Sequence, residues 1–399
     1  MAVCRQMKKL RIIVGGYIGL YPTGGATWDY LQYPLGLHLL GHDVYYIEDT
    51  GQYPTFLQGQ NSWNDAMPCV NYLKQVMEEH GLGDRWSYRD TVTQRSYGLD
   101  DKRIADICRT ADVFINISCS TVMREEYMQI PSRVLLDSDP MFTQIQYAKE
   151  LDNESDLATR NTIELFETHN HLFTFGENIY GDDCIIPRFD FEWKVTRQPV
   201  CLQLWENKTA PPGKSFTSVM NWNPEKTIQF RGDKWGQKDV EFEKIVQTPT
   251  FFPEIDFRVV LNDRSMAEKE LFDRLASLNW KILHPDSVAT PDAYRKFIQQ
   301  SAAEFSVAKE TYVKSNSGWF SCRSACYLAS GRPVITQETG WSKYIPSGKG
   351  LFTFTDQASA RESIKKVETD LANQSRKAKE IAEEYFDSNI VLSNMLEQL

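Results

Sequence analysis

Short apolar runs alternate with amphipathic stretches along the first half of the chain. The apolar runs predict strands over residues 10–16, 43–49, 112–118, 132–140 and 171–178. Amphipathic stretches at 27–42 and 100–111 predict helices between them. Strands that alternate with helices indicate a mostly parallel sheet with crossover connections.

The alternation stops at residues 187–214 and then begins again. This interruption is rich in proline, aromatic and charged residues, which suits a connection between domains. Further strands are predicted over 215–222, 255–262, 279–285, 303–309 and 332–338, followed by an amphipathic helical tail from about 357. We therefore predict an α/β protein with two Rossmann-like domains, residues 1–190 and 215–375, joined by a linker over 191–214. Ligands bind outside the carboxyl ends of such strands, so we expect a site in a shared cleft.

Composition narrows the class of protein. The chain has 399 residues, 41% hydrophobic residues and a formal charge of −10, which argues against a duplex nucleic acid as partner. No apolar run approaches the roughly 20 residues of a membrane span. The eight cysteines form no CxxC pair and lie mostly in apolar patterns, which is typical of buried thiols in a cytoplasmic protein and disfavours a metal site.

Residues 317–341, SGWFSCRSACYLASGRPVITQETGW, combine a loop, a helix and a strand. Ser317 and Ser321 are good N-cap residues, and a helix that starts near Ser321 would offer free N–H groups to a phosphate. Arg323 in the first turn could add a charged contact to a diphosphate. Simple helix capping is the alternative explanation.

The helix then ends at Gly331 and a Pro-Val-Ile strand follows, leading to an acidic loop at Glu338. The first half starts with a strand, a Gly-rich loop and a helix that leads into LHLLGHDVYYIE at 37–48. Together these motifs resemble the GT-B glycosyltransferases, with a C-terminal domain like that of families 1 and 4. The resemblance implies a hexosyltransferase that takes a sugar from a nucleotide diphosphate donor such as UDP-sugar. It also implies that the first domain holds the acceptor and that the helix over 376–399 packs back on it.

The resemblance suggests positions for the donor. It implies no cofactor, because the nucleotide-sugar is a co-substrate, and no metal, because basic residues and a helix N-terminus would neutralise the diphosphate. The implied donor contacts are His284 at the base, Ser317, Gly318, Trp319, Ser321, Arg323 and Ser324 at the diphosphate, and Glu338, Thr339 and Gly340 at the sugar. Lys234 or Lys238 could also neutralise phosphate, although a solvated loop is an equal alternative. Related enzymes often carry an acid where this chain has Cys326 or Gly318, which leaves the stereochemical outcome open.

An inverting transfer needs a base that accepts the proton of the acceptor hydroxyl. The candidates are Asp29, and Asp137 or Asp139 in LLDSDP, of which Asp29 and Asp139 are favoured. A first-turn helix acid for Asp29 and a turn residue for Asp139 are equally good explanations. Tyr17, Tyr21 and Trp28 are suited to stack on an acceptor, or to fill a core. A GT-B-like sugar-nucleotide epimerase and a non-catalytic two-domain binding protein are the alternative functions.

Overall fold

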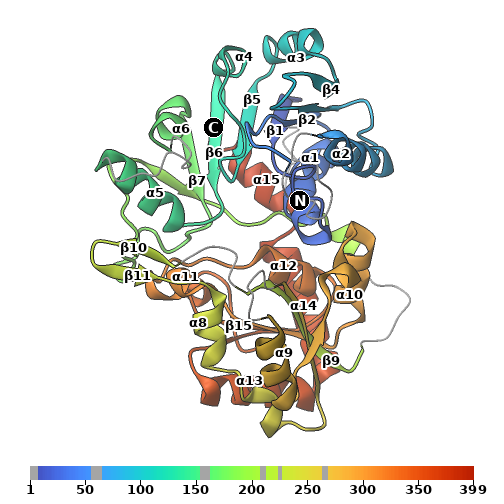
Figure 1. Cartoon of the computed structure of the whole chain (residues 1–399), viewed down its shortest axis with the longest axis vertical. Helices are drawn as coiled ribbons and strands as arrows, with labels where there is room; N and C mark the ends of the chain where they lie inside the picture. The colour runs from blue at the N-terminus through green and yellow to red at the C-terminus, as the bar shows by residue number, and fades with distance from the viewer. Residues whose placement is uncertain (1–7, 55–64, 153–161, 207–212, 223–226, 263–267) are drawn as a thin grey trace, which may run out of the picture.

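The computed structural model describes residues 8–54, 65–152, 162–206, 213–222, 227–262 and 268–399. Residues 1–7 of the predicted first domain and 207–212 of the predicted linker lie outside this range. The described residues form two halves, one above the other in Figure 1, each built around its own sheet. The predicted α/β class with two mostly parallel sheets is confirmed.

The first sheet has eight strands among the described residues. They are β1 (Arg11–Gly15), β2 (Asp43–Glu48), β3 (Trp86–Arg89), β4 (Ser96–Gly98), β5 (Val113–Ile117), β6 (Ser132–Asp137), β7 (His171–Thr174) and β8 (Trp193–Val195). Their order is β4-β3-β2-β1-β5-β6-β7-β8, and the β3–β4 pair is antiparallel while the other pairs are parallel. Helices α1 (Gly24–Leu39), α2 (Met67–Glu79), α3 (Asp101–Cys108), α4 (Glu125–Met128), α5 (Phe142–Leu151), α6 (Thr162–Thr168) and α7 (Leu202–Trp205) accompany this sheet.

The second sheet contains six parallel strands among the described residues. They are β9 (Ser215–Asn221), β12 (Asp256–Asn262), β13 (Lys281–Leu283), β14 (Ala303–Ser306), β15 (Val334–Gln337) and β16 (Leu351–Phe354), in the order β13-β12-β9-β14-β15-β16. A separate hairpin pairs β10 (Ile228–Phe230) with β11 (Asp233–Trp235). The helices are α8 (Lys238–Glu243), α9 (Glu268–Ser277), α10 (Pro291–Gln300), α11 (Glu310–Lys314), α12 (Cys322–Ala329), α13 (Gln357–Thr369), α14 (Leu371–Tyr385) and α15 (Ser388–Leu396), with short 3-10 turns η1 (Thr248–Phe251), η2 (Pro285–Val288) and η3 (Trp341–Lys343).

The first sheet extends into the stretch that we predicted as a linker. Strand β8 pairs with β7 at Leu172↔Trp193. Trp193 is buried, and the Tyr180 hydroxyl lies 2.9 Å from both its backbone N and its backbone O. Three residues are too few for a strand signal in the sequence, so the pairing depends on a partner that lies about twenty residues earlier in the chain.

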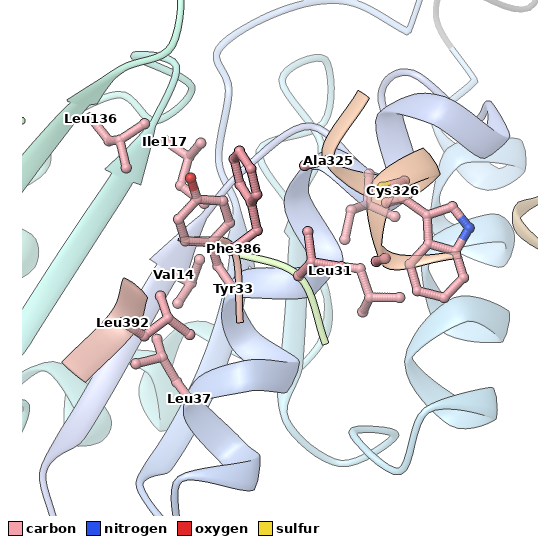
Figure 2. Close-up of a cluster of buried hydrophobic side chains, with 14 of the residues drawn as sticks. Val14, Leu31, Tyr33, Leu37, Ile117, Leu136, Ala325, Cys326, Phe386 and Leu392 are labelled. Atoms are coloured by element: carbon pink, nitrogen blue, oxygen red, sulfur yellow. The ribbon is translucent and has the colours of Figure 1, made fainter. Parts of the chain in front are cut away.

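The C-terminal segment returns to the first half, where α15 lies against α1 (Figure 1). The close approach uses Gly36, since a Cβ there would lie 2.6 Å from Leu392 Cδ1. A bridge between Val200 and Asp387 ties the same segment to the chain just after β8. Figure 2 shows part of the resulting apolar cluster, which joins α1 and the first sheet to α12 and the C-terminal segment.

The carboxyl ends of the strands in both sheets face each other. The Trp319 indole donates to the Ser138 carbonyl at 3.1 Å, and the Asn178 backbone N–H donates to the Ser317 carbonyl at 3.0 Å. Ser138 follows β6 and Asn178 lies just beyond β7, whereas Ser317 and Trp319 lie between β14 and β15. The loops in which open α/β sheets bind ligands therefore meet along the joint between the two halves.

Candidate functional site

A cluster of charged side chains occupies this joint, and we call it the charged cluster. Its members are Asp29, Asp139, Lys238, Glu304, Lys309 and Arg323. Asp29 lies in α1 and Asp139 follows β6, so both belong to the first half. The other four come from the second half, at the start of α8, in β14, just after β14 and in the first turn of α12.

Asp139 connects the two halves through its carboxylate. Lys309 Nζ lies 2.8 Å from Asp139 Oδ1, and the Tyr312 hydroxyl donates to the same oxygen. Burial pushes the Asp139 pKa up, but Lys309 and the two hydrogen bonds outweigh it and hold the pKa below its usual value. Asp139 is therefore a carboxylate anion near neutral pH.

Asp29 has the opposite electrostatic environment. Burial raises the pKa of Asp29 to about 7; Arg323 and Lys238 work against this shift, while the Asp139 charge adds to it. The side chain still keeps some exposed surface. Two carboxylates whose pKa values are pushed apart can take different roles, and the one that titrates near neutrality is suited to move a proton.

Arg323 forms an ion pair with Glu304 of β14. Its Nε donates to Glu304 Oε1 at 2.6 Å, and its Nη1 donates to the Val219 carbonyl at 2.7 Å. Glu304 has no exposed surface, so the guanidinium balances a fully buried charge. Arg323, which we predicted as a diphosphate contact, therefore has a structural role in the second half.

Lys238 brings another cation to the cluster. Burial, with Arg323 and Lys309, lowers its pKa to about 7, while Glu304 and Asp139 act in the opposite direction. Lys234, which we also considered, lies exposed on the β10–β11 hairpin. The structure thus places Lys238, and not Lys234, beside the other charges.

The first turn of α12 contributes Arg323 to the charged cluster, so this helix end lies beside the cluster. Ser321 is the N-cap residue, as the sequence predicts, but its side chain makes no capping hydrogen bond. Ser324, in the first turn, is fully buried, and its hydroxyl has no partner among the described residues. The first N–H groups of a helix have no partner within the helix, so this end can accept an anion.

The remaining loop residues that we assigned to the donor are tightly packed. Gly318 has φ +78° and its N–H donates to the Thr339 carbonyl at 2.6 Å, while a Cβ at Gly318 would lie 2.4 Å from the Asn178 nitrogen. Gly340 also has a positive φ of +98°. The Glu338 carboxylate accepts the N–H groups of Thr339 at 3.1 Å and Gly340 at 2.7 Å. These residues shape the joint between the halves.

Ser317 and Trp319 belong to the same loop. Ser317 is buried, and its hydroxyl donates to the Tyr312 carbonyl at 3.2 Å. The Trp319 ring stacks on the Tyr312 ring with centroids 4.4 Å apart. His284, which we assigned to the base, is the N-cap of η2 and is 71% exposed, beside Asp286.

The three aromatic residues that we assigned to the acceptor differ in their surroundings. Tyr21 is partly exposed, whereas Tyr17 is buried and its hydroxyl accepts from Gln52 at 3.1 Å. Trp28 is 1% exposed, and its indole donates to the Pro291 carbonyl in the second half at 2.9 Å. Trp28 therefore packs in the joint, while Tyr21 keeps surface that an acceptor could contact.

Cys326 is buried against α1, as Figure 2 shows. The Gln32 side-chain amide lies 3.7 Å from its sulfur, and the Gln32 oxygen accepts from the Cys201 backbone at 3.0 Å and the Trp205 indole at 3.1 Å. The position at which related enzymes often carry an acid is thus filled here by a thiol and an amide. The thiol is fully buried, and the nearby charges of Asp29, Glu304 and Arg323 act on it.

The comparisons with known proteins place this geometry in a known fold. No family model matches the chain, and no curated protein was found to be similar in sequence. Solved structures do match. An alpha-glucosyltransferase in complex with UDP and a 13-mer DNA containing an HMU base aligns with a TM-score of 0.61 at 11% identity, covering 98% of this chain and 99% of that chain. HepE from Anabaena, in complex with UDP, aligns with a TM-score of 0.54 at 12% identity, over 98% of this chain and 100% of that one. AviGT4, a glycosyltransferase involved in avilamycin A biosynthesis, aligns with a TM-score of 0.54 at 11% identity, over 98% and 96%.

The chain has the GT-B fold. The charged cluster lies at the joint between the two sheets of this fold, where the carboxyl ends of their strands meet. Within the described ranges, no three His, Cys, Asp or Glu side chains are grouped so that they could hold a metal ion. No helix in the part of the chain that the structure describes is both long and apolar enough to cross a membrane.

Sequence reasoning missed two members of the charged cluster. Lys309 and Glu304 lie in one predicted strand, over 303–309. In the structure β14 ends at Ser306, and Lys309 is the N-cap residue of α11. A charged residue in an otherwise apolar strand indicates a buried ion pair or a ligand site, because a buried charge needs a partner or a ligand. Glu304 is such a residue in the run AEFSVAK.

Proposed function

We propose that this protein is a glycosyltransferase that moves a sugar from a nucleotide diphosphate donor, UDP-sugar in the first instance, to an acceptor held by the first half. The charged cluster carries this proposal. It combines three cations from the second half with two carboxylates from the first, at the place where the two sheets of a GT-B fold meet.

The second half supplies the groups that a leaving diphosphate needs. Lys238, Lys309 and Arg323 bring positive charge, and the start of α12 adds N–H groups and the unpaired Ser324 hydroxyl. Preorganised positive groups stabilise the negative charge that develops on the leaving phosphate. Because three cations already meet there, we propose that transfer does not depend on a divalent metal ion.

The first half supplies the base. The Asp29 carboxylate, with a pKa of about 7, is suited to accept the proton of the acceptor hydroxyl as that oxygen attacks the anomeric carbon. This role fits an inverting transfer. Asp139 is held as an anion by Lys309 and Tyr312, so it is less basic than Asp29.

The acceptor approaches from the loops of the first half, where Tyr21 keeps exposed surface. The structurally similar alpha-glucosyltransferase was solved with DNA. This chain carries a formal charge of −10, so we propose an acceptor other than duplex nucleic acid. We also propose a cytoplasmic location, because Cys69, Cys108, Cys201 and Cys326 are buried thiols that form no disulfide.

The test is a thermal-shift screen across nucleoside diphosphates and nucleotide-sugars, followed by an assay of nucleoside diphosphate release with and without candidate acceptors. We expect a uridine diphosphate or a UDP-sugar to raise the melting temperature. We also expect the sugar of the UDP-sugar to be transferred to an acceptor, or slowly hydrolysed without one. Duplex DNA is included among the acceptors and should not stimulate release. Nucleotide protection without any release would favour a binding protein, and the absence of both would refute the proposal.

Lys238→Gln and Lys234→Gln form a matched pair for this screen. Each removes one lysine from the same loop region, but only Lys238 belongs to the charged cluster. We expect Lys238→Gln to lose most of the nucleotide-induced stabilisation and Lys234→Gln to keep it. The opposite order would place the diphosphate near the hairpin.

A further inference from the structure

The ion pair between Asp139 and Lys309 occupies the place where we position the donor diphosphate. Asp139 comes from the first half, whereas Lys309 and Tyr312 come from the second, about 170 residues later in the chain. One carboxylate oxygen accepts from both the ammonium group at 2.8 Å and the phenol hydroxyl. A phosphate oxygen would accept from the same two donors, because both ligands are anionic oxygen atoms.

The distribution of charge shows which cation Asp139 balances. Arg323 is already paired with the buried Glu304 at 2.6 Å. Lys238 and Lys309 are the remaining cations of the cluster, and Asp29 and Asp139 are the remaining acids. Asp139 is the acid in direct contact with Lys309, so it neutralises that lysine in the protein without donor.

We propose that Asp139 is an internal counter-ion that the donor diphosphate displaces from Lys309 and Tyr312. The inference rests on the proposed function, since it names how that donor site is filled before the donor binds. Donor binding then exchanges the Asp139 carboxylate for the diphosphate at Lys309. The affinity for the donor is reduced because the Asp139–Lys309 ion pair must first be broken.

The exchange has a consequence for Asp29. The Asp139 charge already works to raise the pKa of Asp29, and Lys309 partly neutralises that charge in the free protein. A displaced Asp139 keeps its negative charge in the first half without this lysine, which makes Asp29 a stronger base once the donor is in place. The other contacts across the joint, such as Trp319 to Ser138 and Asn178 to Ser317, do not involve Asp139 and can persist.

The experiment is calorimetric titration of the full chain with UDP and with inorganic pyrophosphate. Asp139→Asn keeps the size of the side chain and removes its charge, so the ligand no longer competes with an anion. We expect Asp139→Asn to bind both ligands about five- to tenfold more tightly than the wild type, which is the range for a partly exposed charged contact. In a Lys309→Gln background, the same substitution should raise the affinity by less than about twofold, because the lysine that both anions share is gone and only the Tyr312 hydroxyl is still shared.

Asp183→Asn is the matched control. Asp183 also forms an ion pair across the joint, with Lys343 at 2.5 Å, and its side chain is 51% exposed against 47% for Asp139. It lies outside the charged cluster, so we expect its removal to change affinity less than twofold. Tighter binding by both variants would mean that loosening the joint, and not removing a competing anion, increases the affinity, and would overturn the inference.

The two proposals fail in different ways. Equal or weaker binding by Asp139→Asn, with clear binding by the wild type, refutes the counter-ion role and leaves the proposed function standing. No binding by the wild type or any variant refutes the donor site itself, and with it this inference. If Asp139→Asn does not fold, Asp139→Ser removes the same charge and is subject to the same criteria.

Discussion

Lys238 provides the most direct test of the donor site, because its charge state should depend on the donor. Burial and the neighbouring Arg323 and Lys309 lower the Lys238 pKa to about 7, from an ordinary value of 10.5. A bound diphosphate adds negative charge beside the ammonium group and raises its pKa again. Donor binding should therefore take up a proton, and affinity should fall as the pH rises through about 7.

The size of the effect follows from linkage. If the pKa of Lys238 returns to its ordinary value in the complex, affinity drops by about 30-fold between about pH 6 and about pH 8.5. This corresponds to about 2 kcal/mol, at roughly 1.4 kcal/mol per tenfold change. Asp29, whose pKa is also about 7, gains a negative charge over the same range and adds to the loss.

Calorimetry with a UDP-sugar measures this directly, because a diphosphate diester does not change its own charge near neutral pH. Titrations in two buffers of different ionisation enthalpy give the number of protons taken up. We expect the wild type to take up about half a proton more than Lys238→Gln at about pH 7. The difference in affinity between the two proteins should shrink by about 30-fold between about pH 6 and about pH 8.5, and it closes only above the pKa of the lysine in the complex. Lys234→Gln should behave as the wild type.

Equal proton uptake by the wild type and Lys238→Gln would refute this reasoning. A second measurement checks the cause of the pKa shift. Because folding places an ammonium group in a site that disfavours its charge, Lys238→Met should raise the unfolding free energy by about 1–2 kcal/mol near neutral pH while it weakens donor binding. If Lys238→Met lowers the unfolding free energy instead, the buried ammonium group does not destabilise the folded protein, and the cause given for its lowered pKa is wrong.

Three further substitutions test other parts of the site. Asp29→Asn should lower kcat by at least about 100-fold and abolish the rise of the rate above about pH 7, with little change in donor Kd at about pH 7; a variant with ordinary kcat would exclude Asp29 as the base. Arg323→Ala should cost about 3–5 kcal/mol in denaturant unfolding, because the buried Glu304 loses its partner, and a loss below about 1 kcal/mol would contradict that pairing. Gly318→Ala should destabilise the protein by about 1–3 kcal/mol in the same assay, since φ is +78° and the new Cβ would lie 2.4 Å from the Asn178 nitrogen; an unchanged unfolding midpoint would show that the loop adjusts freely.

The architecture could be predicted from the sequence because its signals are local. Apolar runs and amphipathic stretches report strands and helices within a window of some ten residues, and their alternation implies parallel sheets. The short strands β3, β4, β10, β11 and β16 were not predicted, and β8 lies within the predicted linker. Runs of three or four residues carry little periodicity, so pairing with a neighbouring strand decides whether they join a sheet.

The candidate site was only partly predictable. The sequence indicated Asp29, Asp139 and Arg323 as candidates, because each follows a strand or starts a helix. It did not distinguish Lys238 from Lys234, four residues apart in the chain, since only the folded chain places the former, half-buried, beside the charged cluster and leaves the latter exposed. It also gave no reason to pair Lys309 with Asp139.

The sequence by itself determined two α/β halves, a helix start suited to an anion and a set of acids near strand ends. The tertiary structure alone decided which charges meet, because contacts such as those of Asp139 with Lys309 and Tyr312 join residues about 170 positions apart. It also decided their protonation, lowering the pKa of Asp139 and raising that of Asp29 to about 7. A pKa depends on burial and on nearby charge, and both quantities exist only after the two halves have come together.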